Sequence, residues 1–455
     1  MRNKHLYLIL VLTIMFLYPN VAKAEIVNPM QVYTHDIMEK DIKTLANTYP
    51  DLISYKSIGK SEYGREIYAV SLGKGLSTSY INASNHAREW ISTNLVMKMI
   101  DEYAKAYKEG QTIGAYNVKT VLDNHTIWFV PMMNPDGVTL QQLGLNSFPK
   151  ADHESLIQMN HGSLDFKRWK ANGKGIDLNR QFDANWGVIR NSPSGPSFAN
   201  FKGTVPHQAS EVKAVIHLTY EIDPEMAISY HSSGSIIFWH FLQQGFQYER
   251  DLFHAKNLSS MTGYRLAGQH SQYSGGGYTD WFTETFKKPA FTPELGTPVG
   301  PTHVPLAQFN RIWEENRLVG LYVASKSHEV YMKRLYASVT SVGLQVNGEP
   351  LVGEVEALLV QGRTLVPVRG LFEKIGADVQ WHSEARVAEI KKNDMIVRLP
   401  LNSNKVTIND ELVELDVPAQ IIYGRLMVPV RFISEAIGAQ VEWDTTTRSV
   451  LIRTP

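Results

Sequence analysis

A histidine and a glutamate stand three residues apart directly after an apolar run. His86 and Glu89 follow the run Tyr80–Ala83, so a turn from a strand into a helix would carry both side chains. At such a turn, a neutral imidazole and a carboxylate can bind one metal ion. The chain has 15 histidines, so about one such pair is expected by chance, and the pair needs partners to indicate a site.

Candidate partners lie at the ends of two further apolar runs. His231 follows the run Glu225–Tyr230, where a third metal ligand from a separate strand is expected. Glu294 closes the run that begins at Phe291. A buried carboxylate without a partner costs several kcal/mol, so a role beside a metal is favoured over an ordinary core position. Three further polar residues cluster at another predicted strand end: Asp177, Asn179 and Arg180.

Apolar spacing predicts alternating strands and helices around these residues. The predicted strands are Ile67–Leu72, Tyr80–Ala83, Thr126–Met133, Glu225–Tyr230 and Ser235–Trp239. The predicted helices are Tyr33–Pro50, Trp90–Ala106, Ala209–Ile222 and Pro305–Ser325. Such alternation is typical of an α/β domain with a mostly parallel, mixed central sheet that has helices on both faces. Sites in these folds gather at the carboxyl ends of the strands.

Length and composition limit both the class of protein and the kind of metal site. A chain of 455 residues exceeds the roughly 250 to 300 residues of a single hydrophobic core, so at least two folded units are expected. A hydrophobic content of 43% and a formal net charge of zero are typical of a soluble folded protein without a nucleic-acid partner. Cysteine is absent, which excludes disulfides and thiolate ligands. Any metal must therefore be bound by histidines and carboxylates.

The first 24 residues have the features of a cleaved secretory signal peptide. Arg2 and Lys4 precede the apolar run Leu6–Tyr18, and Ala22-Lys23-Ala24 supplies small residues at a cleavage site. A membrane anchor is disfavoured, because about 13 apolar residues are too few to span roughly 30 Å of hydrocarbon. Cleavage would leave 42 basic and 45 acidic residues and no stable membrane span. We predict a bacterial protein that is secreted to the extracellular space or the cell wall.

A repeated unit follows the α/β domain, which is expected to occupy residues 25–329. The segment Arg363–Arg369 matches Arg425–Arg431 at an offset of 62, which also pairs Trp381 with Trp443. Two copies of a strand, helix and strands, with helices at 371–375 and 432–437, are predicted within residues 344–455, after a linker at 330–343. We interpret these copies as a spacer or adhesion module for the cell wall. The tryptophans could stack on glycans, but buried core anchors are preferred in small domains.

The ordered motifs resemble the zinc carboxypeptidase family, and within it the bacterial enzymes that cleave the γ-D-glutamyl bond to a diamino acid in peptidoglycan. The resemblance covers about Tyr33 to Tyr322. Its motifs are Ile58–Ser61 with Gly64-Arg65, His86–Glu89, Asn134–Gly137, Asp177–Arg180, His231-Ser232 and Glu294. Each motif is weak alone, but their order and spacing are specific.

The region from about Leu344 to Pro455 resembles a different family, the copper amine oxidase N-terminal or stalk domain. That resemblance implies no copper here, because the copper ligands are missing. Amine oxidation is therefore disfavoured as an activity.

The resemblance to zinc carboxypeptidases implies a role for each candidate residue. His86, Glu89 and His231 would bind Zn²⁺ and leave a fourth position for water, the open geometry of a catalytic site. Zinc would lower the pKa of that water towards about 7 and polarise the scissile carbonyl. Glu294 would accept the proton of the water and pass it to the leaving amine. The other implied roles are Asp177 on the free nitrogen of His86, Asn179, Arg180 and Tyr273 on the substrate carboxylate, Lys170 on the oxyanion, and Arg88 on substrate or oxyanion.

Specificity is expected to depend on Thr279, which the resemblance places at the floor of the pocket for the leaving residue. A polar floor suits the zwitterionic end of diaminopimelate better than a basic or an apolar side chain. We therefore predict a secreted zinc metallopeptidase that cleaves the γ-D-glutamyl-diaminopimelate bond of peptidoglycan stem peptides. Two alternatives remain open: a broad-specificity metallocarboxypeptidase acting on the C-termini of peptides, and a non-catalytic cell-wall-binding protein.

Overall fold

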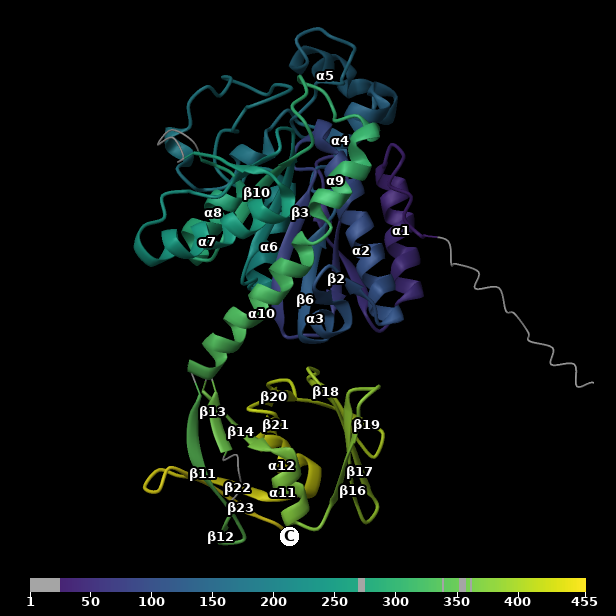
Figure 1. Cartoon of the computed structure of the whole chain (residues 1–455). Coiled ribbons are helices and arrows are strands. Elements are labelled where there is room, and N and C mark those ends of the chain that lie inside the picture. The colour runs from purple at the N-terminus through teal and green to yellow at the C-terminus, as the bar shows by residue number, and fades with distance from the viewer. Residues whose placement is uncertain (1–24, 269–274, 338, 352–356, 361) are drawn as a thin grey trace, which may run out of the picture.

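The computed structural model describes residues 25–268, 275–337, 339–351, 357–360 and 362–455. These residues form an α/β unit and, after it in the chain, a β-rich unit (Figure 1). The predicted signal peptide, residues 1–24, and the predicted substrate-binding residue Tyr273 lie outside the described residues. Among the described residues, no helix is both long enough and apolar enough to cross a membrane.

A mixed sheet of eight strands forms the centre of the α/β unit. Its strands are β1 (Ile53–Lys60), β2 (Glu66–Gly73), β3 (Ser77–Ala83), β6 (His125–Val130), β7 (Ala227–Ser232), β8 (Ile236–Phe238), β9 (Arg265–Leu266) and β10 (Ala290–Leu295). The spatial order is β1-β2-β6-β3-β7-β10-β8-β9, and the four central strands run parallel to one another. Antiparallel pairs join β1 to β2, β2 to β6 and β10 to β8. The predicted mixed, mostly parallel sheet is confirmed.

Helices cover both faces of this sheet. They are α1 (His35–Thr48), α2 (Ile91–Glu109), α3 (Val118–Asn124), α4 (Pro135–Leu143), α5 (His153–Met159), α6 (Ser210–Ile222), α7 (Gly245–Thr262), α8 (Tyr278–Phe286), α9 (Phe309–Asn316) and α10 (Val319–Ala337). Val70, Ile81 and Ile228 share a hydrophobic cluster with α1, α2 and α10. The residues directly before these three lie on the other face of the sheet and share a second hydrophobic cluster with α6 and α8. They are Ala69, Tyr80 and Ala227. Burial on both faces explains why the central strands are continuous apolar runs.

The C-terminal end of the α/β unit differs from the sequence prediction. The single helix predicted at Pro305–Ser325 is two helices, α9 and α10, and α10 continues to Ala337. The last turns of α10 pack on the β-rich unit, where Leu335 joins a cluster with Leu358 and Met427. Because these contacts lie far apart in sequence, local apolar spacing could not predict the extension. Within the predicted linker at 330–343, the first residues therefore belong to α10 and the last to strand β11.

The described residues of the β-rich unit form two sheets and two short helices. Its strands are β11 (Thr340–Val346), β12 (Glu349–Pro350), β13 (Ala357–Val360), β14 (Arg363–Pro367), β15 (Asp378–His382), β16 (Val387–Lys392), β17 (Met395–Pro400), β18 (Lys405–Ile408), β19 (Glu411–Glu414), β20 (Gln420–Ile422), β21 (Arg425–Pro429), β22 (Gln440–Asp444) and β23 (Ser449–Arg453). Helix α11 is Val368–Lys374 and α12 is Val430–Ile437. The two copies share one core, because β14 pairs with β21 and β11 pairs with β23. Each copy places its helix directly after a strand, as predicted.

The paired tryptophans are not core anchors, and that prediction is wrong. Trp381 is 40% exposed and Trp443 is 45% exposed. Both lie on edge strands, Trp381 on β15 and Trp443 on β22, where one side of the strand pairs with no other described strand. The shared core is closed instead by Phe372 and Phe432 from the two helices, each no more than 1% exposed.

Candidate active site

Three neighbouring parallel strands bring the predicted chemistry to one edge of the central sheet. Strands β3, β7 and β10 lie side by side, so their carboxyl ends meet at this edge. His86 follows β3, and Glu89 ends the short 3-10 helix that comes next. His231 lies near the end of β7, directly opposite Glu294 on β10 in the strand register. Residues separated by more than 200 positions are thereby brought together.

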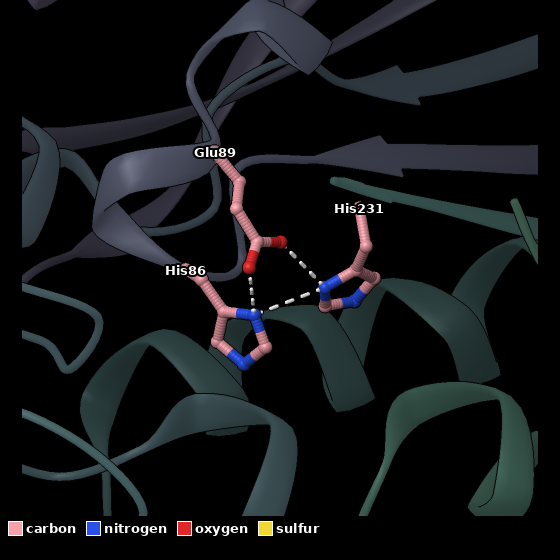
Figure 2. A group of neighbouring side chains, drawn as sticks. All are labelled: His86, Glu89 and His231. Carbon is pink, nitrogen blue, oxygen red and sulfur yellow. Dashed lines mark hydrogen bonds and ion pairs between the residues drawn. The ribbon is translucent and has the colours of Figure 1, made fainter. Parts of the chain in front are cut away.

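His86, Glu89 and His231 point their side chains toward one another (Figure 2). The Nδ1 atom of His86 lies 2.8 Å from Glu89 Oε1, and that of His231 lies 2.9 Å from Glu89 Oε2. The two Nδ1 atoms are 3.1 Å apart. All three side chains are buried, with at most 5% of each residue exposed.

This cluster has the donors that a zinc ion requires. Its three ligand atoms lie within 4.8 Å of one another, close enough to bind one ion. Two imidazole nitrogens and one carboxylate form a donor set that is common at catalytic zinc sites. Burial alone would raise the pKa of Glu89, but His86 and His231 outweigh burial and hold this pKa well below its usual range. The carboxylate is therefore ionised and able to bind a cation.

Asp177 and Lys170 form a second layer behind His86. Asp177 Oδ1 lies 3.1 Å from His86 Nε2, and the Lys170 ammonium donates to Asp177 Oδ2 at 2.7 Å. Lys170 also donates to Asn200 Oδ1 at 3.1 Å. Burial alone would raise the pKa of Asp177, but Lys170 and His86 overcome burial and hold it well below its usual range. An ionised Asp177 keeps the Nε2 proton of His86 in place and leaves Nδ1 facing the cluster.

Asn85 belongs to the candidate site, although it was not predicted from the sequence. Its amide group lies 3.3 Å from His231 Nε2 and 3.0 Å from Ser229 Oγ. If His231 binds a metal through Nδ1, then Nε2 carries a proton and needs an acceptor. Asn85 Oδ1 has no hydrogen-bond partner among the described residues, and rotating the amide would place this oxygen beside Nε2. The only signal in the sequence was an asparagine directly before His86.

Glu294 stands beside the cluster in a position that favours its protonated form. Burial, and next the negative charge of Glu89, raise the pKa of Glu294 to about 7. His231, Lys170 and Arg88 oppose this shift with positive charge. A carboxyl group with a pKa near neutral can both accept and return a proton at physiological pH.

The other predicted site residues surround this centre. The Arg88 guanidinium donates to the carbonyl oxygen of Arg168 at 3.2 Å. Asn179 Oδ1 accepts from the backbone N–H of Tyr278 at 3.2 Å, and Arg180 donates to the carbonyl oxygen of Asn179 at 2.9 Å. The segment that carries Asn179 and Arg180 is thereby connected to the start of α8.

Thr279, in the first turn of α8, contacts the strand that carries Glu294. Its hydroxyl lies 2.9 Å from that of Thr292, two residues before Glu294 on β10. Thr292 was not among the residues predicted from the sequence, although its spacing from Glu294 places both side chains on the same face of the strand. The two hydroxyls form a polar pair between α8 and the strand that carries Glu294, and Thr292 is only 8% exposed.

Two families match successive parts of the chain. The zinc carboxypeptidase family matches residues 38–319, and the copper amine oxidase N-terminal domain matches residues 345–452. The γ-D-glutamyl-L-diamino acid endopeptidase 1 of Lysinibacillus sphaericus is 32% identical over 304 residues, which are 66% of this chain and 74% of that protein. The metallocarboxypeptidase A of Trichophyton tonsurans is 28% identical over 197 residues, 42% of this chain and 41% of that protein. Both resemblances inferred from the sequence are confirmed.

Solved structures share the fold of the α/β unit. Thrombin-activatable fibrinolysis inhibitor aligns with a TM-score of 0.55 at 20% identity, over 68% of this chain and 78% of that chain. The bovine form, in complex with tick carboxypeptidase inhibitor, aligns with a TM-score of 0.53 at 21% identity, over 66% of this chain and 99% of that chain. At these identities the comparison establishes the fold alone.

Proposed function

The chain belongs to the zinc carboxypeptidase family, and on that premise we propose that it cleaves the γ-D-glutamyl-diaminopimelate bond of peptidoglycan stem peptides. Family membership makes it a zinc-dependent hydrolase of the metallocarboxypeptidase type. The observation that carries the choice of bond is the similarity to a γ-D-glutamyl-L-diamino acid endopeptidase across 74% of that enzyme. The polar pair formed by Thr279 and Thr292 supports a polar leaving residue.

His86, Glu89 and His231 hold the zinc in this proposal. Bound by these donors, zinc supplies Lewis-acid chemistry: it lowers the pKa of a water ligand to about 7 and polarises a carbonyl group. Asp177 fixes the orientation of His86, and Asn85 does the same for His231. The ligands therefore keep their geometry when no substrate is present.

Glu294 acts as the general base and then as the general acid. As a carboxylate it accepts a proton from the attacking water, and as a carboxylic acid it donates that proton to the leaving amine. Its position opposite His231 in the strand register and its electrostatic interaction with Glu89 support this role. A cation at the neighbouring site would lower the pKa of Glu294 from about 7 and so increase the fraction of carboxylate at neutral pH.

Positive side chains around Glu294 bind the negative charges of the substrate. Arg88 and Lys170 provide charge for the oxyanion that develops on the scissile carbonyl. Asn179, Arg180 and Tyr273 bind the carboxylate of the leaving residue, with the planar fork of Arg180 suited to a bidentate contact. The paired hydroxyls of Thr279 and Thr292 contact the polar end of that residue.

The protein acts outside the cell in this proposal. Residues 1–24 direct export, and the β-rich unit associates with the cell wall. A wall substrate is consistent with this location, because stem peptides are built into the wall. A second candidate function is removal of C-terminal residues from ordinary peptides. The similarity to a fungal metallocarboxypeptidase A supports it.

The choice between these substrates can be tested with defined peptides. Purified protein spanning residues 25–455 is incubated with the tripeptide L-alanyl-γ-D-glutamyl-diaminopimelate, and the products are identified by mass spectrometry. The matched control peptide has the same residues joined through the α-carboxyl of glutamate. We expect release of diaminopimelate from the γ-linked peptide only. Release of C-terminal residues from ordinary peptides, with the γ-linked peptide left intact, would establish the second candidate function instead.

A further inference from the structure

A cavity of about 530 Å³ lies in the β-rich unit, far in sequence from the cluster of His86, Glu89 and His231. Its walls come from α11, from β15 and β16, and from the hairpin of β20 and β21. Most of its lining is apolar and includes Val368, Val379, Ile421 and Leu426. The volume falls within the roughly 300 to 1,000 Å³ of small-molecule sites, which are also mostly apolar with a few polar groups.

The cavity presents an aromatic side chain and a pair of charged groups. Trp381 lines the cavity, and 40% of this residue is exposed. Arg369 and Glu373 line it from α11, with Arg369 Nε and Glu373 Oε1 separated by 3.6 Å. Both charged side chains are more than half exposed, so they can form hydrogen bonds with a ligand. An apolar interior beside exposed hydrogen-bonding groups suits an amphipathic ligand.

Comparison of the two copies shows why this cavity is open. The offset of 62 pairs Gly370, which lines the cavity, with Phe432 in the second copy. Phe432 is only 1% exposed and packs in the shared core. A Cβ atom added to Gly370 would meet nothing closer than Pro367 Cγ at 3.9 Å and Leu351 Cδ2 at 4.0 Å. The first copy therefore leaves space where the second copy places a phenyl ring.

We propose that this cavity binds an N-acetylated hexosamine unit of a glycan. The apolar face of a sugar ring would lie on Trp381, and the acetamido methyl group would enter the apolar interior. Hydroxyl and amide groups of the sugar would form hydrogen bonds with Arg369 and Glu373. The ligand class rests in part on the proposed action on peptidoglycan, whose glycan strands carry N-acetylated amino sugars. The site itself rests on the cavity, the exposed tryptophan and the Gly370 position.

The proposal can be tested by titrating the protein with sugars in the absence of any peptide. Protein spanning residues 25–455 is titrated with an oligomer of N-acetylglucosamine by isothermal calorimetry. A glucose oligomer of the same length, which lacks the acetamido groups, is the control ligand. We expect saturable binding of the acetylated sugar that is at least about tenfold tighter than binding of the control, a difference of about 1.4 kcal/mol.

Three variants locate the binding to this cavity. Gly370→Phe fills the space as the second copy does, and Trp381→Ala removes the aromatic surface. Each is expected to weaken binding by at least about tenfold. Trp443→Ala, the matched substitution in the second copy, is expected to leave the affinity unchanged. Circular dichroism and thermal unfolding establish that each variant is folded, and Trp381→Ala tests the site independently of the larger side chain at residue 370.

Several outcomes would overturn the proposal. These are the absence of saturable sugar binding, equal binding of the glucose oligomer, and equal affinity in folded Gly370→Phe or Trp381→Ala. In a separate titration, tighter binding of an apolar peptide than of the acetylated sugar would also overturn it and would assign the cavity to a different ligand. Because the titration involves no hydrolysis, its failure is distinct from failure of the proposed peptidase function.

Discussion

The two units of this molecule differ in which side chains occupy energetically unfavourable environments. In the α/β unit, ionisable side chains are buried at the edge of the sheet, including His86, Glu89, Lys170 and Asp177. Among the described residues of the β-rich unit, no histidine, lysine, arginine, aspartate or glutamate is buried. That unit instead leaves two tryptophans nearly half exposed, whereas Trp169 of the α/β unit is completely buried.

This difference indicates where each unit gives up stability for binding. Burying a charge costs several kcal/mol unless another charge or a metal compensates it. Leaving an indole exposed forfeits about 25 cal/mol for each Å² of apolar surface that could have been buried. The first cost falls on the α/β unit at the proposed zinc ligands, and the second falls on the β-rich unit at Trp381.

Removing a predicted metal ligand should have the largest effect on activity. In His231→Ala, a buried carboxylate and one imidazole remain without the third donor, so zinc binding should be lost. We expect kcat/KM to fall by at least about 10³-fold, which corresponds to about 4 kcal/mol of transition-state stabilisation. Zinc content by mass spectrometry and hydrolysis rates measure both effects. A variant with full zinc content and full activity would place the metal elsewhere.

Two tryptophan substitutions test the difference in burial between Trp169 and Trp381. Trp169→Ala removes a completely buried side chain and should lower the free energy of unfolding by about 3 to 5 kcal/mol. Trp381→Ala removes a side chain that is 40% exposed, and its cost should stay below about 1.5 kcal/mol. Urea unfolding measures both values. Equal losses in the two variants would show that Trp381 stabilises its unit as a core residue does.

Asp177→Asn should weaken zinc binding without abolishing it. The asparagine keeps the shape of the side chain but lacks the charge that pairs with Lys170 and orients His86. Loss of such a partner typically costs about 10- to 100-fold in metal affinity or activity. Competition with a chelator measures the zinc affinity. Asp183→Asn, an exposed acid a few residues later, is the matched control and should bind zinc as the wild type does.

Glu211 offers a pH-dependent test of a buried ionisable group away from the predicted metal ligands. Its carboxyl is completely buried, and burial raises its pKa from 4.5 to about 8. Between these pH values the unfolded chain has lost this proton and the native protein keeps it, so stability falls as pH rises. The contribution is at most about 1.4 kcal/mol for each pH unit. Glu211→Gln should remove that slope in thermal unfolding measured across this range, and an unchanged slope would assign it to other groups.

Much of the candidate site could be predicted because its residues end apolar strands. His231 and Glu294 each close a strand that is buried on both faces, and such a strand is visible in sequence as a continuous apolar run. The spacing of His86 and Glu89 indicated a shared metal because both belong to one turn. These signals depend only on residues close together in sequence, so they can be recognised without knowledge of the tertiary fold.

The features that could not be predicted depend on contacts between distant parts of the chain. Asn85 gains its importance from His231, and no spacing rule connects the two residues. Trp381 lies on an edge strand, and sequence alone does not distinguish an edge strand from a central one. Helix α7 was missed because Phe246 and Phe253 are exposed, which obscures the apolar stripe that predicts a surface helix. The pairing of β14 with β21 joins the two copies, and the repeat pattern in the sequence does not show that pairing.

The central claim is that Glu294 transfers the proton at a zinc site formed by His86, Glu89 and His231. Glu294→Gln keeps the size of the side chain but cannot act as a base, so it separates chemistry from metal binding. The decisive measurement is the rate of hydrolysis of the γ-linked tripeptide by zinc-loaded Glu294→Gln. We predict a rate about 10²- to 10⁴-fold below that of the wild type, with one zinc still bound. Hydrolysis at the wild-type rate by the zinc-loaded variant would contradict the proposed mechanism.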